Sequence, residues 1–137
     1  MASDIHNNLE VRRAISPVSV ADNTAQVSQV IDRKGYDALE FFIETGTIAS
    51  GTATFAVTMD HGEASNLSDA LAVPSDQMVG TLATAGFSFS NPNVTRKVGY
   101  IGGKRYVRLT ITPAANAAAA LLTAVAVLGN PAIAPTP

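Results

Sequence analysis

The residues best suited to chemistry are the two histidines, and His61 has the more reactive neighbours. It lies in the segment Asp60-His61-Gly62-Glu63, which places an imidazole beside two carboxylates. Such a group could bind a metal ion or act as an acid and base pair. The spacing matches no standard metal site, and one histidine with two carboxylates is a weak ligand set. We therefore expect a solvated turn at a strand end without a metal ion, and we expect His6 to lie in an N-terminal arm.

A second candidate is the glycine-rich segment Gly99-Tyr100-Ile101-Gly102-Gly103-Lys104-Arg105, whose composition is similar to that of a phosphate-binding loop. Its glycine spacing is one residue short, and Arg105 stands where a Ser or Thr would reach Mg²⁺. A strand is expected to follow it, so no helix N-terminus would meet an anion. The chain also has no Gly-x-Ser-x-Gly elbow. These observations predict a protein that is not an enzyme and has no cofactor.

The third candidate is a basic strand face formed by Lys104, Tyr106 and Arg108. Cations that alternate with an aromatic residue are typical of platforms for single-stranded nucleic acid. One tyrosine and a few cations on a chain with a net charge of -2 make a poor nucleic-acid binder. A strand face that contacts solvent or protein is the alternative, and it is the one we expect.

Charge is distributed unevenly along the chain. All 11 acidic residues lie between Asp4 and Asp76. The charged residues after Asp76 are all basic: Arg96, Lys97, Lys104, Arg105 and Arg108. If these residues share one hairpin, they form a positive patch that would dock on an acidic protein surface. The predicted interaction residues are therefore these five together with Tyr106 and the C-terminal prolines Pro131, Pro135 and Pro137.

Length and composition indicate one domain that faces other proteins or has an unusually uncharged surface. The chain has 137 residues and no cysteine, so packing alone must stabilise the fold. Charged residues make up 15%, well below the usual quarter, because Ala, Thr, Ser and Val replace them. Either much of the surface contacts protein, or this is simply a β domain rich in small residues. No apolar run is long enough to span a membrane, and the polar N-terminus does not resemble a signal peptide.

Alternation of apolar and polar residues predicts an all-β fold. Strand candidates separated by turn residues occupy 9–19, 24–31, 39–44, 53–60, 77–82, 86–90, 97–101 and 104–111, with a long loop over 60–76. Gly102-Gly103 is expected to form a two-residue primed turn that joins the 97–101 and 104–111 strands in a hairpin. This spacing is typical of an antiparallel β-sandwich or a jelly-roll-like barrel. The predicted core consists of Leu39, Phe41, Ile43, Phe55, Val57, Val107, Leu109 and Val125.

The C-terminal part is harder to interpret. Pro113 and Gly129 could begin and cap a helix, whereas the β-branched residues of 121–128 favour a strand. We predict a strand over 119–128, apolar on both faces and therefore central in its sheet or covered by a neighbour, although a helix within 114–128 remains the alternative. The proline-rich tail is expected to be extended. The predicted organisation is an N-terminal arm (1–8), a β-sandwich domain (9–129) and a C-terminal arm (130–137).

Two longer segments and a shorter C-terminal one resemble a known family. Gly35 to Gly46 is similar to the "G-Y-D-S-L-x-F-x-I-x-T-G" segment of small proteins encoded near the major capsid gene of tailed phages and prophages. Val98 to Leu109 is similar to their "V-G-Y-x-G-x-K-R-Y-V-R-L" segment, and Val125 to Pro131 also resembles their C-terminal segment. The resemblance covers most of the chain between Gly35 and Pro131, and it concerns structure rather than catalysis.

This resemblance implies a capsid decoration, or cement, protein on the exterior of the virion. Its partners would be the major capsid protein, bound across neighbouring capsomers, and further copies of itself, as in a homotrimer. Neither a membrane nor a nucleic acid is expected as a partner. A neck, tail-completion or other tail-associated structural protein is the first alternative, and a carbohydrate- or receptor-binding module is the second. An enzyme that uses His61 is the third.

Overall fold

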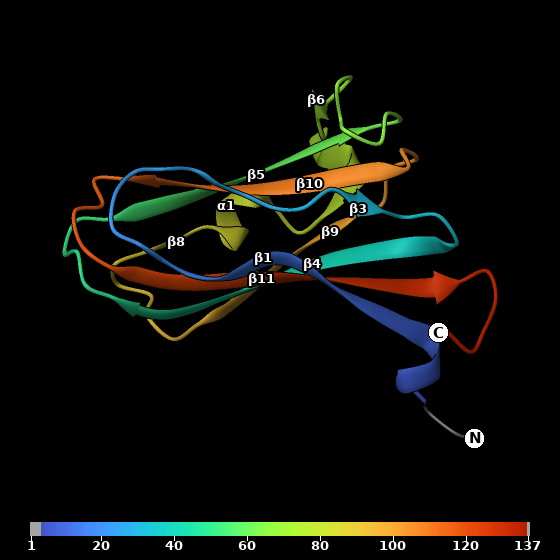
Figure 1. Ribbon diagram of the computed structural model, residues 1–137, viewed down its shortest axis with the longest axis horizontal. Helices are drawn as coiled ribbons and strands as arrows, with labels where there is room; N and C mark the ends of the chain where they lie inside the picture. The colour runs from blue at the N-terminus through green and yellow to red at the C-terminus, as the bar shows by residue number, and fades with distance from the viewer. Residues whose placement is uncertain (1–3, 137) are drawn as a thin grey trace.

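The computed structural model describes residues 4–136, which form two antiparallel β-sheets packed face to face (Figure 1). Sheet A has five strands in the order β1-β11-β4-β9-β7. Its strands are β1 (Leu9–Val20), β4 (Tyr36–Ile48), β7 (Met78–Val79), β9 (Thr95–Tyr100) and β11 (Ala120–Pro131). The predicted all-β, single-domain sandwich is confirmed.

Sheet B has the order β2-β10-β5-β6, while β3 also pairs with β10 and β8 with β5. Its strands are β2 (Gln26–Val27), β3 (Ile31–Asp32), β5 (Thr54–Gly62), β6 (Leu71–Ala72), β8 (Phe87–Ser88) and β10 (Tyr106–Ala114). Residues 4–136 also contain three short helical turns: η1 (His6–Asn8), η2 (Ser75–Gln77) and α1 (Leu82–Ala85).

The core lies between the two sheets and follows the alternation predicted from the sequence. Seven of the eight predicted core residues are buried: Leu39, Phe41, Ile43, Phe55, Val57, Val107 and Leu109. The eighth, Val125, is half-buried and points to the other face of its strand, so its assignment to the core is wrong. Ala124 and Ala126 take that place because β11 lies between β1 and β4, where small side chains fit against the core.

The hairpin predicted across Gly102-Gly103 does not form. β9 pairs with β4 and β7 in sheet A, whereas β10 pairs with β2, β3 and β5 in sheet B. The two glycines therefore carry the chain from one sheet to the other, and neither has the positive φ that a primed turn requires. The connections β4 to β5 and β10 to β11 also cross between the sheets, as in jelly rolls.

Residues 120–131 form a strand, which resolves the ambiguity between strand and helix. β11 pairs with β1 on one side and β4 on the other, so it is central, as its apolar faces predicted. Elsewhere the predicted strands are shorter. The 24–31 strand is interrupted between β2 and β3, where Ser28 bonds to Leu109 through both its amide and its hydroxyl group.

Other local predictions change because short polar contacts compete with strand pairing. In the 77–82 segment only β7 is a strand, since Thr81 and Thr84 form a reciprocal capping box that begins α1. The 86–90 strand is reduced to β8. β5 extends to Gly62, and the predicted 60–76 loop also contains β6 and η2.

The described parts of the two predicted arms lie against the domain rather than extending from it. β11 continues to Pro131, which pairs with Tyr36, and the amide of Ala132 donates to the carbonyl of Gly35 over 2.8 Å. Thr136 then bonds back to the N-terminal segment near η1. Backbone groups of Ala132 and Thr136 thus find partners within the fold, while the role of the two segments as arms that contact a neighbour stays a prediction.

Candidate protein-interaction surfaces

The fold separates the predicted basic residues into two sheets. Arg96 and Lys97 lie on β9 in sheet A, whereas Tyr106 and Arg108 lie on β10 in sheet B. Lys104 and Arg105 lie between these strands, at the end of the sandwich. The predicted basic residues therefore do not form one hairpin face.

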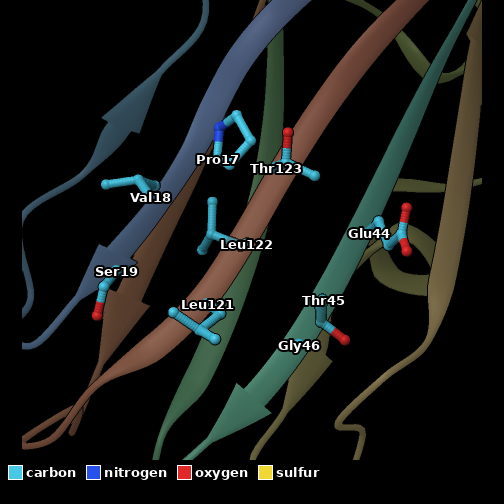
Figure 2. Close-up of a pocket in the computed structure, with 9 residues that line it drawn as sticks. All are labelled: Pro17, Val18, Ser19, Glu44, Thr45, Gly46, Leu121, Leu122 and Thr123. Carbon is cyan, nitrogen blue, oxygen red and sulfur yellow. The ribbon is translucent and has the colours of Figure 1, made fainter.

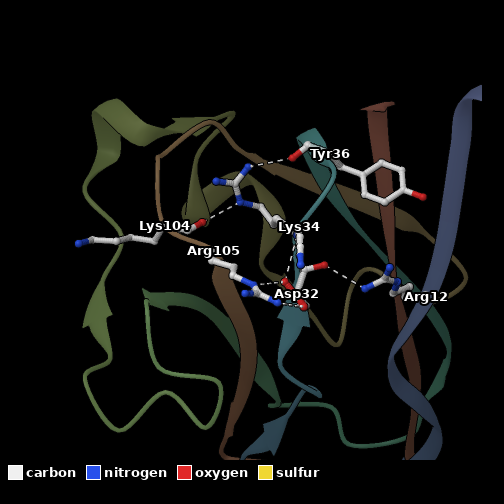
Figure 3. Close-up of polar contacts among 7 residues, drawn as sticks. Arg12, Asp32, Lys34, Tyr36, Lys104 and Arg105 are labelled. Atoms are coloured by element: carbon white, nitrogen blue, oxygen red, sulfur yellow. Dashed lines mark hydrogen bonds and ion pairs between the residues drawn. The ribbon is translucent and has the colours of Figure 1, made fainter. Parts of the chain in front are cut away.

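Two of the basic residues are neutralised by acids from earlier in the chain. Arg105 donates to both carboxylate oxygens of Asp32 at 2.8 Å, and Figure 3 shows this pair together with the turn around Lys34. The guanidinium group of Arg105 lowers the pKa of Asp32 to about 2. Arg108 bonds to Asp60 at 3.2 Å on the outer face of sheet B. The charge asymmetry of the sequence is thus partly cancelled in space.

Lys97 and Lys104 form no ion pair with the residues between 4 and 136. Lys97 is exposed on the outer face of sheet A. The side chain of Lys104 points away from Asp32 and Arg105 toward solvent (Figure 3). Of the predicted basic residues, these two lysines retain the most freedom to contact a partner.

The 101–105 loop that carries Lys104 is fixed by backbone contacts. The guanidinium group of Arg33 donates to the carbonyls of Lys104 and Gly102, each at 2.9 Å, and lies 4.9 Å from the ring centre of Tyr100. The hydroxyl group of Tyr100 accepts from the amide of Lys104 at 2.9 Å. This loop is therefore held in one shape while the side chains of Ile101 and Lys104 stay exposed.

His61 is buried, so the predicted solvated turn is wrong. It lies within β5, and its Nδ1 atom is 2.8 Å from the Tyr100 hydroxyl group. The direction of this hydrogen bond is set by the histidine tautomer, and the same hydroxyl group also accepts the Lys104 amide. Burial, followed by the nearby charge of Lys104, lowers the pKa of His61. The geometry gives this histidine a structural partner.

No cluster of three or more metal-binding side chains occurs within residues 4–136. The 99–105 segment leads into β10, so it offers no helix N-terminus to a phosphate group. In the described part of the chain, no helix is long and apolar enough to cross a membrane.

The outer face of sheet A carries a group of apolar side chains that sequence reasoning did not single out, next to the charged residues Glu40, Glu44 and Lys97. Pairing places Val11, Val127 and Glu40 in one row across β1, β11 and β4, with Val125 and Phe42 in the next. Val11 is 64% exposed and Leu121 is 45% exposed. The same alternation that puts Phe41 in the core turns Phe42 outward. The apolar character of both faces of 121–128 was the signal for this surface.

The outer face of sheet B differs in kind. Its central strands expose threonines and the ion pair of Arg108 with Asp60, and its outward residues on β5 and β10 include Thr54, Thr58, Thr110 and Thr112. The pair of Arg108 with Asp60 neutralises the charge at the centre of this face, while Val27, opposite Thr110, is 54% exposed at its edge. The two outer faces of the sandwich therefore have different chemistry.

A shallow groove marks one end of the outer face of sheet A. Figure 2 shows its lining along β1, β11 and β4, and its volume is about 430 Å³. Its lining residues are Pro17, Val18, Ser19, Glu44, Thr45, Gly46, Leu121, Leu122 and Thr123. Leu121 covers Gly46 so closely that a methyl group there would lie 3.0 Å from the Leu121 Cβ atom. We call this the Leu121 groove, and its single charged residue is Glu44.

A second hollow surrounds Glu40 near the other end of the same face, beside Leu9, Phe42 and Val127. Burial raises the pKa of Glu40, and the charge of Lys97 opposes that effect. The Glu40 carboxylate makes no hydrogen bond or ion pair with the residues between 4 and 136. A carboxylate among apolar side chains is a polar contact point on a docking surface.

The C-terminal prolines are placed only in part. Pro131 ends β11, and Pro135 lies in the bent tail, which returns to the N-terminal segment. Pro137 lies outside the described residues. Near this tail, Ile133 is 82% exposed and Ile5 is 70% exposed.

No protein-family model matches the chain, and no curated protein matches its sequence. Among solved structures, the PBSX exported protein XepA superposes with a TM-score of 0.57 at 12% identity, over 94% of this chain and 39% of that one. The chain thus spans well under half of XepA. At this identity the likeness concerns the fold alone.

Two other solved structures are less similar. The SPBc2 prophage-derived protein YomS has a TM-score of 0.43 at 10% identity, over 92% of this chain and 98% of that one. The CBM22-1 xylan-binding domain of Paenibacillus barcinonensis Xyn10C has a TM-score of 0.48 at 12% identity, over 92% and 88% of the two chains. Neither superposition is close enough to support an argument about function.

Proposed function

We propose that this chain is a non-enzymatic structural protein of a tailed-phage virion, and that it decorates the capsid by binding the major capsid protein across neighbouring capsomers. The observation that carries the proposal is the group of apolar side chains Val11, Phe42, Val125 and Val127 on the outer face of sheet A, beside Glu40 and Lys97, which form no ion pair among residues 4–136. On the outer face of sheet B, by contrast, Arg108 is paired with Asp60. A decoration protein needs one face for the shell and one for solvent. The resemblance of residues 35–46 and 98–109 to proteins encoded near the major capsid gene points to that partner.

Two further observations support a binding role. No cluster of metal-binding side chains occurs in residues 4–136, and His61 is engaged with Tyr100 rather than with an open cleft. The fold is similar to that of XepA, an exported protein of phage PBSX. In this proposal the part of the outer face of sheet A around Val11, Val127 and Glu40 lies on the shell, and the Leu121 groove at the other end of that face is left uncovered. The threonine-rich face of sheet B forms the exterior of the virion.

The test uses bare heads that lack the protein. Val125→Asp places a charge on the outer face of sheet A, and Thr110→Asp places the same charge on the outer face of sheet B. We expect Val125→Asp to abolish binding to heads, measured by co-sedimentation, while Thr110→Asp binds like the wild type. Circular dichroism verifies that both variants fold. Equal binding by both would refute sheet A as the docking face.

Copy number separates this proposal from the neck or tail alternative. Decoration requires on the order of hundreds of copies in a purified virion, whereas a neck ring requires roughly six or twelve. Quantitative gel densitometry against the major capsid protein measures this ratio. A copy number of roughly six or twelve per virion would refute capsid decoration and support the neck or tail role.

A further inference from the structure

The 101–105 loop has the form of a rigid projection with one apolar and one cationic side chain. Ile101 is 58% exposed, and Lys104 is exposed without an ion pair among residues 4–136. Arg33 and Tyr100 hold the backbone on both sides of these residues. Because the loop is already ordered, a contact through it loses little conformational entropy.

The Leu121 groove has the complementary chemistry. Its walls include Pro17 and the exposed side chain of Leu121, and its single charged lining residue is the carboxylate of Glu44. Glu44 is exposed and makes no hydrogen bond or ion pair with the described residues. An apolar side chain accompanied by a cation would therefore fit this groove.

These two sites lie toward opposite ends of the same molecule. The loop follows Tyr100, which pairs with Leu39, whereas Glu44 pairs with Thr95. Five residues along a strand correspond to roughly 17 Å. The loop therefore cannot reach the groove of its own chain. The loop and the groove can contact each other only when they belong to different copies.

We infer that the 101–105 loop of one copy docks in the Leu121 groove of a second copy, with Ile101 against Leu121 and Lys104 paired with Glu44. This contact joins two different surfaces, so an open assembly keeps one free loop at one end and one free groove at the other until a ring closes. The inference goes beyond capsid binding, because it assigns a contact between copies and can be tested without capsid protein.

The nearby charges agree with this arrangement. The amides of Glu63 and Ala64, which donate to the Asp69 carboxylate, lower the pKa of Asp69, and the charge of Lys104 adds a smaller effect without forming an ion pair. Arg105 is held by Asp32 and does not compete for the groove. The Lys104–Glu44 pair would lie at the rim of the contact, where charge mainly fixes orientation and salt screens it.

Sedimentation velocity of the full chain at low salt tests the inference. We expect the wild type to self-associate, and we expect Lys104→Glu and Glu44→Lys each to weaken association roughly tenfold or more because like charges then meet. The double variant, Lys104→Glu with Glu44→Lys, restores the opposite charges and should regain association. Ile101→Ser should weaken it without any change of charge.

Lys34→Glu is the matched control, since it makes the same charge change on an exposed turn outside the loop. It should associate like the wild type. Melting curves verify that each variant is folded. A wild type that stays monomeric, single charge variants that associate normally, or a double variant that does not recover would each overturn the inference. Binding to bare heads is measured separately, so failure here leaves the capsid proposal to its own test.

Discussion

The hydroxyl group of Tyr100 and the Nδ1 atom of His61 lie 2.8 Å apart and join the two sheets through one buried hydrogen bond. Tyr100 lies on β9 of sheet A and His61 on β5 of sheet B. The same hydroxyl accepts the amide of Lys104, so a single oxygen atom links both sheets to the loop between them. Loss of this atom leaves the Nδ1 atom of buried His61 and the partly buried amide of Lys104 without this partner.

Tyr100→Phe is therefore expected to lower the free energy of unfolding by about 1–3 kcal/mol. Urea unfolding monitored by circular dichroism measures the change. Tyr106→Phe is the matched control, because the Tyr106 ring lies on the outer face of sheet B and its stacking with Arg105 needs no hydroxyl group. The free energy of unfolding of the Tyr106→Phe variant should stay within about 0.5 kcal/mol of the wild-type value. Equal effects of the two changes would contradict the bridging role.

The buried His61 also predicts how stability depends on pH. Its pKa is lowered in the fold from the ordinary value of 6.5, mainly by burial and then by the charge of Lys104. The unfolded chain therefore binds a proton at a pH where the folded chain does not. Stability is fully present above about pH 6.5 and is lost as pH falls toward the lowered pKa of the folded state.

His61→Gln should remove this part of the pH dependence, whereas the wild type loses stability as pH falls below about 6.5 toward the lowered pKa of folded His61. Three acids face the imidazole, Asp60, Asp69 and Glu63, and they oppose the shift. Glu40 acts with the opposite sign, since burial raises its pKa. The difference between wild-type and variant unfolding curves at each pH thus isolates His61. Parallel curves would show that His61 does not titrate in this window.

Phe41 and Phe42 are adjacent in sequence but should respond differently to truncation. Phe41 is fully buried between the sheets, so Phe41→Ala is expected to destabilise the fold by about 3–5 kcal/mol. Phe42 is half-buried on the outer face of sheet A, so Phe42→Ala should cost less stability and weaken binding to heads. Unfolding curves and head co-sedimentation measure the two effects. A larger loss of stability from Phe42→Ala would contradict the assigned faces.

The contrast between these two residues shows what could be predicted from sequence. Strict alternation fixes which side chains share a face, so Leu39, Phe41 and Ile43 were assigned to the core correctly. Alternation failed for Val125 because both faces of β11 are apolar, so no polar residue marks the outward face. The apolar character of both faces nevertheless predicted correctly that β11 is central in its sheet.

Connectivity and charge pairing could not be predicted in this way. Gly102-Gly103 suits a tight hairpin and a crossover between sheets equally well in local terms, and tertiary pairing selects the crossover. The bond of Arg105 to Asp32 joins residues far apart in sequence, so the basic patch of the sequence could not reveal its own neutralisation. The interaction residues expected from charge alone were accordingly distributed over two sheets.

The C-terminal tail provides the last prediction, because its bonds tie it to the start of the chain. The amide of Thr136 donates to the carbonyl of Asn7 at 2.9 Å, and its hydroxyl group donates to the carbonyl of Leu9 at 2.7 Å. Together with the bond of Ala132 to Gly35, these contacts close the end of sheet A where β1 begins. Deletion of residues 132–137 should therefore lower the free energy of unfolding by about 1–3 kcal/mol.

Thr136→Val removes only the hydrogen bond that the Thr136 hydroxyl group donates to Leu9. It should lower the free energy of unfolding by about 1 kcal/mol. Ile133→Ser is the control, since this side chain is 82% exposed and its loss should leave unfolding unchanged. The tail could instead act mainly as an arm that grips a neighbour. In that case the deletion would leave urea unfolding of the isolated protein unchanged and would weaken binding to heads, and the contacts of Thr136 would then contribute nothing to the fold.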